Sequence, residues 1–512
     1  MSCKFAICSF LSLLLAVLSA GCKKKELYRT NLLSFKKDQV IDPSEMRFAQ
    51  QYFILDNVML KLVKLGSNEE YQNDLAKKLE FSKDKKTLKI VLNEAFFSDG
   101  SQIKAKDVEM SLKRAVLNGA PHVNIDNLFT GAKNLKKITD SIAGIKVLSD
   151  IELQLKMTRP TKEILFFLSL TDLGILHKSQ YMKGKILLSD WTGVTSGPYK
   201  VTFNEKEQIV LASNPKTFRY TAKMPPKVTF ESYKGSNVIE KLKSGELDFG
   251  MITFIDYLKN IKIIENLKGY KVMSDKTDGI VYMTLNTKSG LFSKTGNRQW
   301  VQKKVLESFV VDAQYNPAAK KAYQFFLPQA KGYIPDAKVL KLLSHVDTNE
   351  TPEDLKNGFT IKMIKGMKYY MIPDIGEQLS KVLGIDVKID MTVPNDTYLQ
   401  FINERNFDAT AIGFGMSYKV LGEAMNIQYL SKNPMLLDPT GKIKSLLKDY
   451  QEHDNLVDES KIISKILKQM TVDSECVPLF YFSSPYFVNE KTLTAKTLSY
   501  DDSVKFYKME RK

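Results

Sequence analysis

The N-terminal segment of the chain determines where the rest of it has to fold. Met1 to Lys4 is a short basic start, residues 5–18 are almost wholly apolar, and Ser19-Ala20-Gly21 leads directly into Cys22. A basic start, an apolar stretch and small residues at its end are typical of a secretory signal. We therefore expect the working protein outside the cytoplasm, and we do not expect reactions that need cytosolic ATP or nucleic acid.

The cysteine at the end of this segment adds a second expectation. The order of residues resembles a bacterial lipoprotein signal, in which the cysteine is lipidated and cleavage makes it the first mature residue. This predicts a signal peptide over residues 1–21, a lipid on Cys22 and a membrane tether over residues 22–31. The usual leucine three places before the cysteine is Ser19 here, with Leu18 one place earlier. A plain signal peptide that ends near a cysteine therefore remains the alternative.

Composition indicates a globular protein held at a membrane surface. The 512 residues are 43% hydrophobic and 26% charged, which is enough for two or three domains with buried cores. After the signal, no apolar run approaches the roughly 20 residues that span a bilayer, and the nearest, residues 164–176, is interrupted by Thr171 and Asp172. Residues 23–25 are all lysine and would lie beside anionic headgroups.

The net charge of +17 does not by itself predict a nucleic-acid partner. The lysines are scattered among acidic residues along the whole chain, without an arginine-rich tract or interleaved aromatic residues. A basic surface that faces anionic envelope polymers or lipids is the better interpretation. We expect no nucleic acid among the partners.

A search for catalytic and metal-binding motifs is negative. The four histidines are not at metal-ligand spacing, and neither a nucleophile elbow, a phosphate-binding loop nor a His-Glu-x-x-His motif is present. Cys476 is the only cysteine after Cys22 and lies in an apolar run, so it is predicted to be a buried small hydrophobe. We expect neither catalytic residues, nor a cofactor, nor a metal. An envelope hydrolase or chaperone remains an alternative without a nominated nucleophile.

The pattern of apolar residues predicts mixed α and β structure. Residues 79–81 and 88–92 flank a polar stretch as in a β-hairpin, and residues 107–116 have one apolar helical face. Further strands are predicted at residues 209–211, 228–230, 280–285, 385–389, 409–414 and 479–487, with helices at residues 238–244 and 374–383. This mixing without a long linker favours discontinuous domains.

Two motifs after the hairpin carry a family resemblance. Phe97-Ser98-Asp99-Gly100 forms a turn, and Ala105-Lys106-Asp107-Val108 opens a helix. Together they resemble the family-5 extracellular solute-binding proteins, the oligopeptide- and dipeptide-binding components of ABC importers. Other landmarks follow in the order of that family: Asp42-Pro43, Ser196-Gly197-Pro198-Tyr199-Lys200, Asn214-Pro215, Gly245-Glu246-Leu247-Asp248, Tyr282 to Asn286, Leu383-Gly384-Ile385, Phe407-Asp408 and Cys476-Val477-Pro478-Leu479.

The resemblance implies an α/β, periplasmic-binding-protein-like fold of class II, cluster C. This fold is a two-lobed clamp with an extra inserted subdomain. Lobe I would be discontinuous, lobe II would follow it, and the chain would cross between the lobes near residues 274–278 and 482–486. The implied ranges are 32–52 with 193–277 and 485–512 for lobe I, 53–192 for the inserted subdomain, and 278–484 for lobe II.

The resemblance also suggests the ligand contacts and shows where this chain departs from the family. Peptide-binding members hold an ammonium group with an aspartate that aligns with Ser417, after a tryptophan that aligns with Phe414. A glutamate of oligopeptide binders falls on Arg47. The expected ligand contacts are Arg47, Tyr282, Phe414, Ser417 and Tyr418. The alternatives are core packing for Tyr282 and Phe414, a surface charge for Arg47, and a loop residue without a ligand role for Ser417.

A neutral serine would not hold a buried ammonium group, because losing a charge partner there costs a few kcal/mol. Either the alignment slips locally or the ligand is not a free-amine peptide held in the usual way, and Glu423 is a candidate substitute anion.

The expected function is that of a monomeric, lipid-anchored binding protein in the cell envelope. It would capture a peptide or muropeptide-like ligand and deliver it unaltered to the permease subunits of an ABC importer. The alternative keeps the fold but assigns an adhesion or signalling role at the surface, with an altered ligand specificity. The anchoring membrane, the permease and the length of the ligand stay open.

Overall fold

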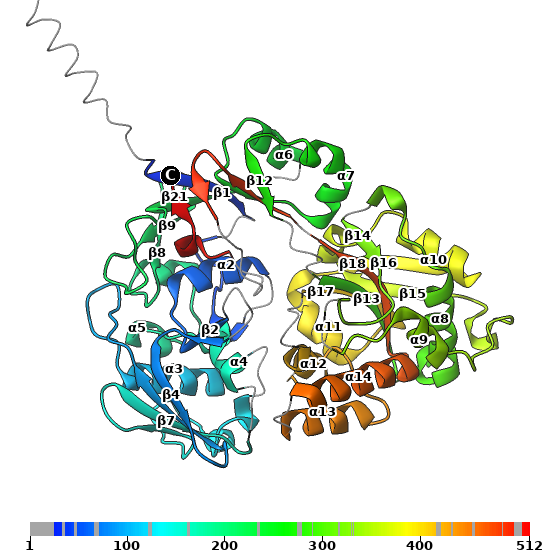
Figure 1. Cartoon of the computed structure of the whole chain (residues 1–512), viewed down its shortest axis with the longest axis horizontal. Coiled ribbons are helices and arrows are strands. Elements are labelled where there is room, and N and C mark those ends of the chain that lie inside the picture. Colours follow the sequence, from blue (N-terminus) through cyan, green and yellow to red (C-terminus); the bar gives the residue numbers. More distant parts are fainter. Residues whose placement is uncertain are drawn as a thin grey trace, which may run out of the picture.

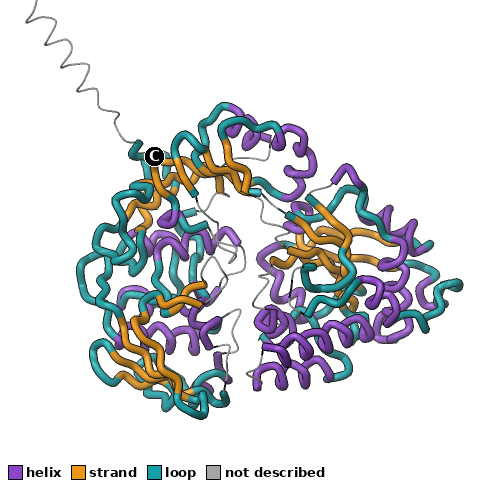
Figure 2. Tube along the Cα trace, viewed as in Figure 1, coloured by secondary structure: helices purple, strands orange, loops and turns teal. Residues whose placement is uncertain are grey.

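The chain folds into two bodies, lobe I and lobe II, that lie side by side and are joined at one end (Figure 1). The structure, a computed structural model, describes residues 25–32, 36–45, 49–65, 71–120, 125–160, 164–232, 236–273, 279–288, 290–315, 318–328, 330, 332–415, 421–431, 434–452, 456–483, 485–495 and 504–512. In lobe II, strands lie inside and helices outside, whereas lobe I is richer in strands and loops (Figure 2). The mixed α/β, two-lobed fold is the expected one.

Lobe I contains a seven-stranded mixed sheet in the order β12-β19-β11-β1-β10-β9-β8. Its strands are β1 (Leu27–Leu32), β8 (Tyr199–Phe203), β9 (Ile209–Ser213), β10 (Lys227–Ser232), β11 (Phe249–Met251), β12 (Tyr270–Met273) and β19 (Tyr486–Asn489). The helices of this part are α2 (Ala49–Val58), α6 (Ser236–Lys243) and α7 (Phe254–Glu265). A small pair, β20 (Leu493–Thr494) with β21 (Glu510–Arg511), lies beside the start of β1 (Figure 1).

The expected tether over residues 22–31 is wrong in its second half, because Leu27–Leu32 is a central strand. β1 is parallel to β10 on one side and to β11 on the other. Tyr28 and Thr30 are buried, whereas Leu27 and Arg29 are exposed, which is the alternation of a strand with one covered face. A tether can therefore extend only to about residue 26.

The inserted part of the chain, within residues 53–192, forms its own four-stranded antiparallel sheet. The order is β4 (Ala76–Phe81), β5 (Thr87–Leu92), β7 (Glu152–Lys156) and β6 (Ile145–Val147). The hairpin of β4 and β5 confirms the prediction, and Leu88, Ile90 and Leu92 point into a separate core. Its other elements are β2 (Val63–Leu65), β3 (Tyr71–Asn73), α3 (Ala105–Asn118), α4 (Ile164–Ser169) and α5 (Lys178–Tyr181).

The predicted helix at residues 107–116 is the longer α3. Its N-cap residue Lys104 has no capping side chain, but the Asp107 carboxylate accepts the Lys104 backbone N–H at 2.9 Å. One orphan donor of the first turn is thereby satisfied from inside the helix.

Lobe II contains a six-stranded sheet in the order β14-β18-β13-β17-β15-β16. The strands are β13 (Gly279–Leu285), β14 (Ala319–Lys321), β15 (Phe359–Ile364), β16 (Val387–Val393), β17 (Ala409–Gly415) and β18 (Cys476–Phe482). The helices are α8 (Thr295–Ser308), α9 (Asp336–Leu342), α10 (Ile375–Leu383), α11 (Tyr398–Glu404), α12 (Leu421–Leu430), α13 (Lys442–Glu452) and α14 (Leu456–Asp473).

β13 is buried along its whole length because both faces of the lobe II sheet are covered. Val281 and Met283 face a core that includes side chains of α8 and α10, and Ile280 and Tyr282 face a second core with α11 to α14. Lobe I and the inserted subdomain have cores of their own. Within the described ranges, no helix combines the length and the apolar character that crossing a bilayer requires.

The predicted late β run at residues 479–487 is two strands in different sheets. β18 belongs to lobe II and β19 to lobe I, so the chain changes lobe between Phe482 and Tyr486. It changes lobe a second time between the end of β12 at Met273 and the start of β13 at Gly279. Both passages fall at the predicted crossing points.

Candidate ligand site at the junction of the lobes

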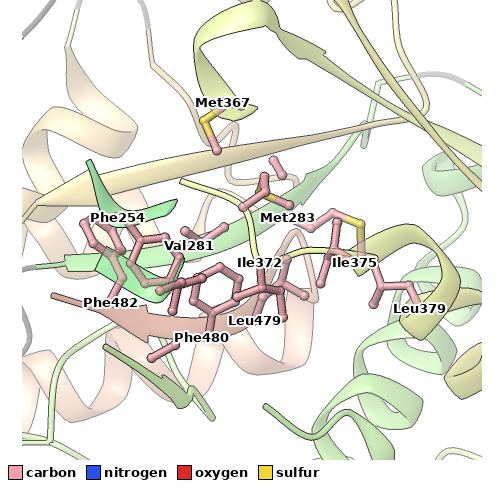
Figure 3. Close-up of a cluster of buried hydrophobic side chains, with 14 of the residues drawn as sticks. Phe254, Val281, Met283, Met367, Ile372, Ile375, Leu379, Leu479, Phe480 and Phe482 are labelled. Carbon is pink, nitrogen blue, oxygen red and sulfur yellow. The ribbon is translucent and has the colours of Figure 1, made fainter. Parts of the chain in front are cut away.

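An apolar contact joins the lobes beside the two passages. Phe254, the first residue of α7 in lobe I, stacks on Phe480 of β18 with ring centroids 5.7 Å apart and an interplanar angle of 23°. It also meets Phe482 at 5.8 Å. Figure 3 shows these three rings next to Val281, Met283 and Leu479 of the lobe II sheet. The core on this face of the lobe II sheet therefore continues into lobe I, and we name it the bridging core.

Gly279 starts β13 at the tightest point of this junction. A Cβ at this position would lie 2.4 Å from the Phe414 carbonyl oxygen and 2.8 Å from Phe482 Cζ. A side chain cannot be accommodated there without moving a strand, because a carbonyl oxygen of β17 is fixed by the sheet. Glycine therefore lets β13, β17 and β18 come together where the chain enters lobe II.

An aromatic row runs from the interior of lobe II to the end of β17. The Tyr282 ring meets Phe325 edge-on at 5.2 Å, and Phe325 meets Phe414 at 5.8 Å. Phe414 is half-buried and pairs with Ile280 of β13. It is the last residue but one of β17, which ends at Gly415. An aromatic side chain that is partly exposed at the end of a strand can contact a bound molecule and remain anchored in a core.

Tyr282 itself is completely buried, which revises its expected role. Its hydroxyl donates to Gln428 Oε1 of α12 at 2.7 Å, and burial raises its pKa well above the usual value. A ligand finds no surface of Tyr282 to touch. The packing alternative holds for this residue, which contacts the Phe325 ring and donates a hydrogen bond to Gln428.

The other predicted site residues cannot be placed. Cys22, Arg47, Ser417 and Tyr418 lie outside the described residues, as does the side chain of Glu423. Of the five predicted ligand contacts, only Phe414 and Tyr282 are therefore located. Both lie on the lobe II sheet, on neighbouring strands.

Behind the aromatic row lies a buried carboxylate that the sequence analysis missed. Glu475 precedes β18 and accepts the backbone N–H groups of Leu437 at 2.7 Å and Asp438 at 3.1 Å. Burial raises its pKa to about 7, against the lowering effect of these two N–H groups and of Arg405 and Arg298. The available signal was its position directly before a wholly apolar strand, but this signal is weak because acidic side chains are almost never fully buried unless they are paired.

A polar hollow elsewhere in lobe II is not part of this junction. It has a volume of about 440 Å³ and is lined by Asn286, Gly290, Thr360, Lys362, Asp390 and residues 405–408. Residues 405–408 lead into β17, whereas Phe414 lies at the other end of that strand. The hollow therefore lies at the wrong end of β17 to serve the predicted ligand contacts.

The cysteine prediction is confirmed, since Cys476 is free and buried in the strand β18, with its pKa raised by burial. Among the residues that the structure describes, no group of three or more His, Cys, Asp or Glu side chains could hold a metal ion.

Comparison with known proteins identifies the family. A model described as the middle region of bacterial extracellular solute-binding proteins, family 5, matches residues 70–434. The chain belongs to this family. The family-5 proteins are extracytoplasmic solute-binding proteins of transport systems. No curated protein matches the sequence.

Solved structures of family-5 type share the fold over nearly the whole chain. The periplasmic oligopeptide-binding protein OppAIV of Borrelia burgdorferi is 17% identical, with a TM-score of 0.75, and the match covers 95% of this chain and 100% of that one. The murein tripeptide-binding protein MppA of Escherichia coli is 15% identical, with a TM-score of 0.75 and coverage of 95% and 99%. AgaA from A. tumefaciens R10, solved with agropinic acid, is 18% identical, with a TM-score of 0.75 and coverage of 95% and 98%.

Proposed function

We propose that this family-5 protein is a lipid-anchored clamp that captures peptides or peptide-like cargo between its lobes and delivers it to an ABC permease. The observation that carries the proposal is the way the lobes are joined. Two chain passages and the bridging core, in which Phe254 packs on Phe480 and Phe482, connect two bodies that each have a further core of their own. Such a connection supports rigid-body closure about a hinge, with the cores unchanged.

The ligand would lie at the end of β17 and contact Phe414. Backbone groups at a strand end can hold a peptide backbone as an added strand, while aromatic surface covers its side chains. Arg47, Ser417 and Tyr418 remain proposed contacts. With Ser417 in place of a carboxylate, cargo whose amino end is blocked or otherwise uncharged suits the site better than a free-amine peptide.

The proteins of similar fold named above were described with an oligopeptide, a murein tripeptide and agropinic acid as ligands. Peptides and muropeptide-like fragments are therefore the first candidates to test. Tyr282 is assigned a supporting role in this proposal, because it is fully buried.

The test is ligand-induced stabilisation of the purified protein. A ligand that binds only the folded state raises the melting temperature, and at a hundredfold excess over Kd it adds about 2.7 kcal/mol. We expect this shift with members of a peptide library or a cell-wall digest, and we expect the recovered ligand to be chemically unaltered. Phe414→Ala should weaken binding about tenfold, since the loss of one aromatic contact costs more than 1 kcal/mol.

Phe81→Ala is the matched control, because Phe81 is an exposed aromatic residue of the inserted subdomain. It should leave the affinity unchanged. If no member of either ligand set shifts the melting temperature, the capture function is wrong and the surface role in adhesion or signalling takes its place. Hydrolysis of the added peptide would also contradict the proposal.

A further inference from the structure

The direction of β1 relates the N-terminal end of lobe I to lobe II. β1 is parallel to β11, with Thr30 beside Phe249, and β11 is antiparallel to β19, with Met251 beside Tyr486. The C-terminal end of β1 therefore lies at the end of the sheet where β19 arrives from lobe II. β12 also ends there, at Met273 beside Tyr486. Leu27, the first residue of β1, lies at the opposite end, about 17 Å away for a strand of six residues.

The short stretch before β1 limits how far that end can be from a lipid on Cys22. Five residue steps separate Cys22 from Leu27. A fully extended chain covers at most 3.6 Å per residue, so Leu27 stays within about 18 Å of the lipidated cysteine. This limit depends on covalent geometry alone. The start of β1 must therefore lie close to the membrane whenever Cys22 is lipidated.

Several chain segments meet at this end of lobe I. Leu27 pairs with Lys227, Arg511 donates to the carbonyl oxygens of Ala222 and Lys223, and Lys512 donates to Thr492 and Glu490. We name the surface formed by residues 25–28, 222–227, 489–494 and 510–512 the β1 edge. Figure 1 shows the start of β1 and β21 together here, at the upper left of the view, whereas lobe II lies at the right.

Basic side chains outnumber acidic ones at the β1 edge. The acidic residues are Glu26, Glu490 and Glu510, and the basic residues are Lys25, Lys223, Lys227, Lys491, Arg511 and Lys512. Glu26 pairs with Arg511 at 3.8 Å and Glu510 with Lys223 at 3.7 Å. Lys25 pairs with the buried carboxylate of Asp248, which leaves six basic against four acidic side chains. The sequence adds Lys23 and Lys24 directly before the edge. The excess charge is positive and complements an anionic surface.

We infer that the β1 edge is the membrane-facing surface of the anchored protein, with anionic phospholipid headgroups as its partner. In this orientation lobe I is the part nearest the bilayer, and lobe II lies farther from it. This inference rests on the lipid anchor of the proposed function. Its partner follows from the reach of the tether and the sign of the charge, and it does not depend on which cargo the lobes hold.

The test measures the distance of two labelled positions from lipid headgroups. The full chain is produced in a bacterium, purified with its lipid and placed in vesicles of phosphatidylethanolamine and phosphatidylglycerol. A fluorophore is attached at Lys223→Cys in the β1 edge or at Lys448→Cys on α13 of lobe II, both exposed positions. Cys476 is buried and is not expected to react. Energy transfer to a headgroup acceptor should be strong from position 223 and weak from position 448.

Charge reversal tests the headgroup contact. Lys227→Glu with Lys491→Glu should reduce energy transfer from position 223. Each lysine is expected to contribute a factor of about five to the equilibrium constant for contact between the edge and the headgroups. The control pair Lys341→Glu with Lys444→Glu, exposed in lobe II, should have no effect. Phosphatidylcholine vesicles should reduce transfer as the edge variant does. Transfer that is unchanged by either would overturn anionic lipid as the partner.

Equal transfer from both positions, or stronger transfer from position 448, would overturn the orientation. Mass spectrometry of the N-terminal peptide shows whether Cys22 carries lipid, and an unmodified cysteine would overturn both the anchor and this inference. The thermal shift with peptides, measured on the same preparation, reports ligand capture separately. A failure of the inference is thereby distinguishable from a failure of the capture function.

Discussion

The Asp42 carboxylate is completely buried and ties lobe I to the inserted subdomain. Arg114 of α3 donates to it through Nη1 at 2.9 Å and Nη2 at 2.5 Å, and the Ile186 N–H donates at 2.9 Å. Burial alone would raise the pKa of Asp42. The hydrogen bonds and the charge of Arg114, together with two hydrogen bonds from Ser44, bring this pKa below the ordinary value. The Asp-Pro landmark of the sequence is therefore a structural joint.

The Ser196 to Tyr199 landmark is a joint of the same kind. A Cβ on Gly197 would lie 2.3 Å from the Val58 carbonyl carbon, at the end of α2. The Ser196 hydroxyl donates to the Ile175 carbonyl at 2.6 Å, and the Tyr199 hydroxyl donates to the Pro225 carbonyl at 2.8 Å. Residues that reveal the family in the sequence thus hold the lobe together, which is why they indicate the fold and not the cargo.

The buried carboxylate of Glu475 should make the stability of the protein depend on pH. Its pKa is about 7 in the folded protein, mainly because of burial, whereas the ordinary pKa of a glutamate is 4.5. Between these two values the folded state holds the proton more tightly, so unfolding releases it and the free energy of unfolding falls as pH rises. The contribution of Glu475 should fall by about 3 kcal/mol between pH 4 and pH 8 and then stay constant.

The measurement is urea denaturation across this pH range for the natural protein and for Glu475→Gln. The variant cannot titrate at this position, so its stability should fall less as pH rises. The difference between the two proteins isolates Glu475 from other titrating groups. Parallel curves for the two proteins would show that the pKa of Glu475 is the same in the folded and unfolded states, which would contradict the prediction.

Among the secondary-structure elements, strands β13 and β18 are the ones that connect lobe II to lobe I. Both are buried along their whole length, and both continue towards a strand of lobe I. A strand buried on both faces is stiff, so the proposed closure of the lobes would leave β13 and β18 themselves unbent. The residues at the ends of β13 and β18 would therefore matter more for the proposed closure than those in their middle.

Gly279→Ala is the corresponding prediction. The new methyl group would meet the Phe414 carbonyl oxygen and the Phe482 ring, so β13 must shift, at a cost of about 1–3 kcal/mol in the free energy of unfolding. Ligand affinity should fall as well, because Phe414 moves with β17. Denaturation and ligand titration check the two effects.

Gly296→Ala in α8 is the control, since no atom lies within 4 Å of a Cβ placed there. It should be neutral or stabilise the protein by up to about 1 kcal/mol, because alanine is the better helix former. Equal effects of the two substitutions would argue against a tight junction at Gly279.

The whole molecule has several cores, and the bridging core makes them cooperate. Lobe I, lobe II and the inserted subdomain each bury a separate cluster of side chains. The bridging core extends from the lobe II sheet to α6, α7 and β12. Unfolding of one lobe therefore removes apolar partners from the other, which couples their stability.

Phe254→Ala should uncouple the lobes. Phe254 is fully buried, and its removal is expected to cost about 3–5 kcal/mol. Because the contact with Phe480 and Phe482 is lost, we expect two calorimetric transitions for the variant and one for the natural protein. Phe53→Ala, in the core of lobe I alone, should cost a similar amount without separating the transitions. A single transition for Phe254→Ala would contradict the coupling.

Local patterns in the sequence determined much of this protein. The hairpin of β4 and β5, the helix α3 and the strand β13 were predictable, because alternation and helical spacing lie within short stretches. Only the tertiary structure decided that Leu27–Leu32 is a central strand, that Tyr282 is closed to ligand and that Glu475 sits in a core. The partners that decide these three points are distant in sequence, as in the bond from the Arg29 N–H to Asp248, 219 residues away. No local pattern contains such a partner, so burial and charge state emerge only once the chain has folded.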